Sequence, residues 1–200
     1  MQILMISGSR NREGRTARAI EAISKGVAKA GGKSEYIFLP ELNIERCRQC
    51  DKDGRGICDS ENRCIIEDDF ASVVAKLIGA DAVVFASPVY FYDLSESMRA
   101  FLDRLRRITP RPDPSPRKFF PLPGVSPLMP PPGAIPAVGV CMAGGGGGGA
   151  PYSCVILERY LPECGFDVVD LIPIRRQNFE FKLKILPFTG EWLATKPTSG

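Results

Sequence analysis

The sequence has 200 residues, of which 44% are hydrophobic and 24% charged, and these values are typical of one globular domain with a full core. Its net charge of +3 is small and its basic residues are scattered, which argues against nucleic-acid binding. The chain has no histidine, which excludes Ser/His/Asp and Cys/His catalysis and every metal site that uses histidine.

A short apolar run and a polar loop open the chain. Residues 3–6 predict one buried strand, and apolar side chains at helical spacing predict a helix that starts near Ala17 and ends near residues 31–32. The loop between them suits a phosphate, because a helix N-terminus offers free N–H groups and partial positive charge. An ordinary turn whose arginines face water fits the same residues equally well. The groups that favour a phosphate are the hydroxyls of Ser7, Ser9 and Thr16, the charges of Arg10, Arg12 and Arg15, and the flexible backbone at Gly8 and Gly14.

The next segments predict a second strand, a polar loop and a second helix. Residues 35–39 predict the strand, and residues 43–67 form a cysteine-bearing loop with few apolar side chains. Asp68 or Asp69 is predicted to cap an amphipathic helix that Gly79 ends.

A third strand, at residues 82–86, leads into the aromatic segment 87–93. Asp93 stands three residues before Glu96, a spacing that predicts a capping box for the following helix. Three arginines on that helix are expected on its solvated face, where they could also attract a phosphate of NADPH: Arg104, Arg106 and Arg107.

Residues 109–136 hold most of the chain's 18 prolines and predict an excursion without helix or central strand. A strand at residues 137–141, a glycine run and a helix from Pro151 to the glycine at 165 follow. Residues 167–172 predict the last strand, and the tail from Arg175 has weak helical patterning.

This alternation predicts an α/β fold with a doubly wound parallel sheet of five strands, in a single domain over residues 1–200. Ligands of such sheets bind at the carboxyl ends of the strands. Three loops lie there, with phosphate-binding, aromatic and bare-backbone character, and together they favour a phosphorylated planar heterocycle, of which FMN is the simplest. Two alternatives remain: the aromatic residues could be core, and the glycine run could be a linker.

The motifs Gly8–Thr16, Ser87–Tyr90 and Phe101–Arg104 resemble the NADPH-dependent FMN reductase and iron–sulfur flavoprotein families, which have the flavodoxin-like fold. The resemblance covers roughly residues 1–107 and 135–178. It implies bound FMN, NAD(P)H as co-substrate and a homodimer or homotetramer. It implies phosphate contacts from Ser9, Asn11, Arg15 and Thr16, ring contacts from Pro88, Val89, Tyr90 and Phe91, and a second ring wall at Gly144, Gly145, Gly146 and Gly147.

The seven cysteines form two groups. Cys141, Cys154 and Cys164 lie in apolar segments and are expected in the core. Cys47, Cys50, Cys58 and Cys64 lie where iron–sulfur flavoproteins carry a four-cysteine motif, although Asp53 stands where the third cysteine of that motif is usual. Four thiolates here could hold a [4Fe–4S] cluster or zinc; alternatively, the loop binds no metal and keeps its thiols as packing or redox-sensitive groups.

The sequence therefore predicts an FMN-dependent oxidoreductase that takes hydride from NAD(P)H and passes electrons to a quinone, a flavin, a metal or an iron–sulfur acceptor. A non-enzymatic electron carrier that serves protein partners is the alternative. No signal-peptide pattern and no apolar run long enough for a membrane span is seen, so a cytoplasmic protein without nucleic-acid or membrane partners is expected.

Overall fold

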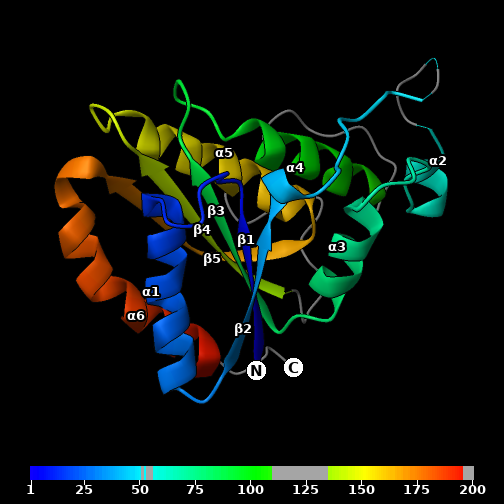
Figure 1. Cartoon of the computed structure of the whole chain (residues 1–200). Helices are drawn as coiled ribbons and strands as arrows, with labels where there is room; N and C mark the ends of the chain where they lie inside the picture. The colour runs from blue at the N-terminus through cyan, green and yellow to red at the C-terminus, as the bar shows by residue number, and fades with distance from the viewer. Residues whose placement is uncertain (51, 53–55, 110–134, 196–200) are drawn as a thin grey trace.

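Five parallel strands form one sheet in the order β2-β1-β3-β4-β5, as the predicted doubly wound fold requires (Figure 1). The computed structural model describes residues 1–50, 52, 56–109 and 135–195. The strands are β1 (Gln2–Ser7), β2 (Lys33–Phe38), β3 (Ala82–Pro88), β4 (Ile135–Ala143) and β5 (Phe166–Arg175). The helices are α1 (Arg15–Lys29), α2 (Gly56–Glu61), α3 (Phe70–Ile78), α4 (Glu96–Ile108), α5 (Gly149–Glu163) and α6 (Phe179–Thr195), and short 3-10 turns cover Leu39–Glu41 and Arg176–Asn178.

Helices cover both faces of the sheet, with α1 and α6 on one face and α3, α4 and α5 on the other (Figure 1). Strand β1 shows how the sequence produces two cores, because successive side chains of a strand point to opposite faces. Ile3 and Met5 pack with α1 and α6, whereas Leu4 and Ile6 pack with α3, α4 and α5. All four are buried, which explains the continuous apolar run.

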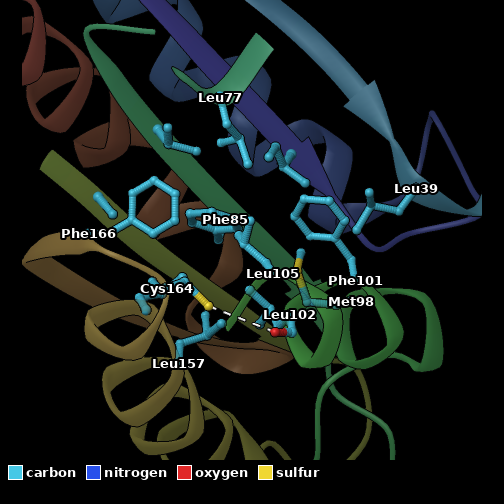
Figure 2. Close-up of a cluster of buried hydrophobic side chains, with 14 of the residues drawn as sticks. Leu39, Leu77, Phe85, Met98, Phe101, Leu102, Leu105, Leu157, Cys164 and Phe166 are labelled. Carbon is cyan, nitrogen blue, oxygen red and sulfur yellow. Dashed lines mark hydrogen bonds between the residues drawn. The ribbon is translucent and has the colours of Figure 1, made fainter. Parts of the chain in front are cut away.

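The core under α4 and α5 is built from aromatic and aliphatic side chains (Figure 2). The rings of Phe85 and Phe166 lie edge to face with centroids 5.1 Å apart. The thiol of Cys164 donates to the carbonyl of Leu102 across 3.8 Å, and burial raises its pKa. Cys141 and Cys154 are buried as well, which confirms that these three cysteines belong to the core.

Two glycines let α1 and α6 cross in direct backbone contact. A Cβ atom on Gly26 would lie 1.8 Å from the carbonyl oxygen of Pro187, and one on Gly190 would lie 1.9 Å from that of Ile23. The tail therefore forms a helix that completes one face of the sheet, although its own pattern is only weakly helical.

Several local expectations differ from the structure. The capping box at Asp93 is wrong: Ser95 caps α4 by accepting the N–H of Met98, whereas Asp93 lies in the preceding turn. Asp68 Oδ1 accepts the N–H of Phe70 at the start of α3, but Asp69, the N-cap residue, makes no side-chain cap bond. The cysteine loop contains the short helix α2, which lies beside α4.

Most of the proline-rich insertion, predicted over residues 109–136, lies outside the described residues. Strand β4 begins at Ile135, inside the range that was predicted for the insertion. In the part of the chain that the structure describes, no helix is long and apolar enough to span a membrane.

Candidate functional site

The loop after β1 is held by its own hydroxyl groups. Ser7 is fully buried and its Oγ accepts the N–H of Ser9 at 3.2 Å, while Ser9 Oγ accepts the N–H of Asn11 at the same distance. Thr16 is also buried, whereas Arg10 and Arg15 are exposed. The predicted phosphate-binding residues thus line one compact turn.

Helix α1 starts from this turn without a side-chain cap and without an acidic residue in its first turn. No carboxylate within that turn offsets its partial positive charge, which suits an anion site. The side chain of Arg12 makes its contacts outside this turn: it forms an ion pair with Glu41 and stacks on the ring of Phe38. Among the described residues, no carboxylate pairs with Arg10 or Arg15.

The loop after β3 ends in a tight aromatic turn. Tyr90 and Asp93 exchange two backbone hydrogen bonds of 3.0 Å, and the two central residues, Phe91 and Tyr92, have φ values of 49° and 67°. Such values suit glycine or asparagine far better than aromatic residues. Phe91 is 97% exposed and Tyr90 61% exposed, which contradicts the alternative that these aromatics are core.

The glycine run lies between β4 and α5 and touches both other loops. An ideal Cβ on Gly144 would lie 4.0 Å from Arg15 Nη1, and one on Gly149 would lie 2.8 Å from Val89 Cγ1. Gly144, Gly145 and Gly146 are exposed, and Gly147 has a φ of +83°. The three loops after β1, β3 and β4 therefore meet at the carboxyl edge of the sheet, as Figure 1 shows.

A cavity of about 860 Å³ adjoins two of these loops. Its wall includes Gly8 and Arg10 after β1, Tyr90 after β3, and Leu42 and Cys47 after β2. In the sheet order, the segment after β2 and the glycine run after β4 lie on opposite sides of the two central loops. The cavity thus lies between the predicted flavin loops and the cysteine loop.

All four cysteines of the loop line one small pocket: Cys47, Cys50, Cys58 and Cys64. Arg104 and Arg107 line it as well, and their charges would offset those of thiolates. Within the described residues, no three potential ligands lie close enough to hold a metal. The donor set fits a thiolate-held metal or cluster, but its members are not gathered around one point.

Cys58 interacts electrostatically with Cys47 and Cys64. Burial raises the pKa of Cys58, the neighbouring Cys47 raises it further, and the positive charge of Arg107 opposes both effects. A metal or cluster that binds thiolates would have to overcome this raised pKa.

Arg104 was expected on a solvated face, and this expectation is wrong: its side chain is 1% exposed. It forms a buried ion pair with Asp68 and donates to Cys64 Sγ at 3.3 Å. Sequence reasoning missed the pair, although Arg104 stands three residues after Phe101 and thus on the apolar stripe of α4. Arg106 and Arg107 are half-buried.

A family model described as NADPH-dependent FMN reductase matches residues 1–149. The chain belongs to the NADPH-dependent FMN reductase family. An iron–sulfur flavoprotein of Methanocaldococcus jannaschii is 31% identical over 106 residues, which are 53% of this chain and 52% of that protein. The chain spans about half the length of the relatives that it matches in this way.

Solved structures agree on the fold of this family member. An NAD(P)H:quinone oxidoreductase from Methanothermobacter marburgensis has a TM-score of 0.64 at 18% identity, with 98% of each chain covered. A flavodoxin from the domain Archaea has a TM-score of 0.58 at 15% identity, with 97% of this chain and 96% of the other covered. The predicted flavodoxin-like fold is confirmed.

Proposed function

We propose that this protein is an FMN-dependent oxidoreductase that takes hydride from NAD(P)H and passes the electrons to a second acceptor. The observation that supports the proposal best is the meeting of the three loops after β1, β3 and β4 at one edge of the sheet. Family membership supports the same cofactor. Bound FMN would supply hydride acceptance at its flavin ring, so no side-chain base is needed.

The residues of each loop have separate tasks in this proposal. Ser7, Ser9, Asn11, Gly14, Arg15 and Thr16 would hold the phosphate at the start of α1, with Arg10 adding positive charge. Pro88, Val89, Tyr90 and Phe91 would pack against one side of the flavin. Gly144, Gly145, Gly146 and Gly147 would bring backbone N–H groups to the ring edge, where they stabilise negative charge on the reduced flavin.

The cavity is the proposed entry for nicotinamide cofactor and acceptor. It combines apolar walls at Leu42 and Ile44 with Tyr90 and with the exposed charge of Arg10, a composition that suits a planar, anionic molecule. Its wall also contains Cys47, so an acceptor held by the cysteine loop would lie next to the same space.

The cysteine loop is the proposed site of a [4Fe–4S] cluster, held by Cys47, Cys50, Cys58 and Cys64. The shared pocket and the two arginines support it, and the names of the relatives agree. A single zinc ion is the alternative for the same thiols. The proposal also includes a homodimer or homotetramer, which the 97% exposure of Phe91 favours, since a neighbouring subunit could cover this ring.

Anaerobic titration of the purified protein with NADPH tests the activity. Rapid loss of the yellow flavin absorption is expected. Bleaching by a reduced ferredoxin but not by NADPH would instead support an electron carrier, which the exposed Cys50 at the loop surface favours. A colourless protein that takes up no FMN would contradict both. An assay of iron and acid-labile sulfide separates cluster from zinc.

A further inference from the structure

One guanidinium group connects the two ends of the cysteine loop. Arg104 Nη1 donates to the carbonyl oxygen of Glu45 at 3.1 Å and to Asp68 Oδ2 at 2.5 Å. Its Nη2 donates to Cys64 Sγ at 3.3 Å, to Asp68 Oδ1 at 3.0 Å and to the carbonyl oxygen of Ile66 at 3.5 Å. Glu45 precedes the first cysteine by two residues, and the other partners are the last cysteine itself and the residues two and four positions after it.

The group that makes these contacts is rigidly placed. Arg104 belongs to α4, whose apolar face is buried in the core, and its guanidinium lies 4.2 Å from the ring centre of Phe70. Both side chains of the Arg104–Asp68 pair are excluded from solvent. Arginine suits this position because its planar fork serves several acceptors at once, whereas the compact ammonium of lysine does not.

The two arms of the loop need such a connection. Closing a loop of this length costs conformational entropy, and the described part of the loop has only one short helix of its own. Thiolates gathered at one point also repel one another, and a fixed positive charge beside Cys64 Sγ reduces that repulsion.

We propose that Arg104 is the positioning residue of the cysteine loop: it holds the arm that carries Cys47 and Cys50 against the arm that carries Cys64, and places a positive charge beside the last thiol. The inference rests on the proposed thiolate site and assigns a role to a residue outside it. It holds for any thiophilic metal or cluster that the loop takes up.

Three variants test the role in metal-free protein. Arg104→Lys keeps the positive charge but lacks the planar guanidinium that donates to several acceptors at once. Arg104→Met combined with Asp68→Asn removes both charges together, so that neither is left buried and unpaired if the single variant fails to fold. Arg159→Lys is the control for the same exchange of side chains, because Arg159 is exposed on α5, lines neither the cysteine pocket nor the larger cavity, and forms no hydrogen bond or ion pair among the described residues.

Hydrogen exchange gives the first readout. In Arg104→Lys and in the double variant, the hydrogen-bonded amides where the two arms meet, those of residues 43–45 and 69–70, are expected to exchange at least about tenfold faster than in wild type. Exchange in the sheet and the thermal midpoint of Arg159→Lys should stay at the wild-type values. Unchanged exchange of the loop in both Arg104 variants overturns the proposal.

Cadmium titration gives a readout that general loosening of the fold would not reproduce. The ultraviolet cadmium–thiolate absorption of wild type should exceed that of Cys64→Ser, the reference for one lost ligand. Arg104→Lys should approach the Cys64→Ser spectrum and bind Cd²⁺ about 10–100-fold more weakly. A spectrum and affinity equal to those of Arg159→Lys would contradict the role.

The two proposals fail in different ways. Wild-type protein without iron and sulfide, whose cadmium spectrum still depends on Arg104, refutes the cluster and retains the positioning role. Wild-type protein with a cluster that Arg104→Lys retains at the same iron content and reduction potential refutes the positioning role alone.

Discussion

Arg104 Nη1 lies 2.5 Å from Asp68 Oδ2, and both side chains are buried. The pair joins α4 to the segment that enters α3, so it couples the cysteine loop to the core of the sheet. Breaking one half of such a pair leaves an uncompensated buried charge, which typically costs about 3–5 kcal/mol.

The stability of the protein should therefore depend on pH through Asp68. Burial raises the pKa of Asp68, but hydrogen bonds from Arg104 and from the N–H groups of Glu45 and Phe70 outweigh it and leave the pKa below its ordinary value. A carboxyl whose folded pKa lies below the unfolded value stabilises the fold above the unfolded pKa, about 3.9. This contribution is lost as the pH falls through the folded pKa.

Urea unfolding at a series of pH values measures this effect. Wild type should lose free energy of unfolding below about pH 4, and Asp68→Asn should lose less over the same range. Glu13→Gln is a control, since Glu13 is exposed and forms no ion pair among the described residues. Parallel acid curves for wild type and Asp68→Asn would contradict this interpretation.

Replacing Gly190 with alanine should destabilise the protein. The added Cβ would lie 1.9 Å from the carbonyl oxygen of Ile23, so α1 and α6 must move apart. Overpacking typically costs about 1–3 kcal/mol, of which the better helix propensity of alanine returns about 1 kcal/mol. Gly79→Ala is the control, because its nearest neighbour lies 3.8 Å away and its φ is ordinary. Equal thermal midpoints for the two variants would refute the close crossing.

The aromatic turn is expected to lower the free energy of unfolding and to contribute to ligand binding. Phe91→Asn combined with Tyr92→Gly suits the positive φ values of the turn and should stabilise the protein by about 1 kcal/mol or more. If these rings contact the flavin or its substrates, the same variant should bind FMN more weakly or react more slowly with NADPH. Chemical unfolding measures the effect on stability, and FMN titration with the rate of reduction by NADPH measures the effect on function. Unchanged FMN affinity and an unchanged rate would show that the two rings have no part in the function.

The shape of the glycine loop should determine FMN affinity. Gly147→Ala places a Cβ 2.9 Å from Arg175 Cβ in a backbone with a φ of +83°, so the loop must rearrange. We expect FMN to bind at least about tenfold more weakly, a change of about 1.4 kcal/mol. Gly31→Ala is the matched control, because Gly31 has a similar φ of +79°, meets no atom within 4 Å and lies outside the three loops. Fluorescence titration with FMN compares them, and equal affinities would exclude the loop from the site.

The spacing of apolar residues, and the residues that end each apolar segment, were sufficient to predict the layered fold from the sequence alone. The continuous apolar runs at 3–6, 82–86 and 137–141 predict strands that helices cover on both sides, and β1, β3 and β4 have this form. The tail was less clear, because Gly190 and Pro187 weaken its helical pattern. Only the crossing with α1 explains why a small residue stands at position 190.

At the candidate site, sequence identified the three loops and the four cysteines, since glycine, hydroxyl, aromatic and thiol groups reveal chemistry by type and spacing. Tertiary structure alone decided which loops meet, that Arg15 lies beside the glycine run, and that all four cysteines line one pocket. It also decided that Arg104 is buried. A charged residue on an amphipathic helix is normally solvated, and only a carboxylate brought from 36 positions away could compensate its burial.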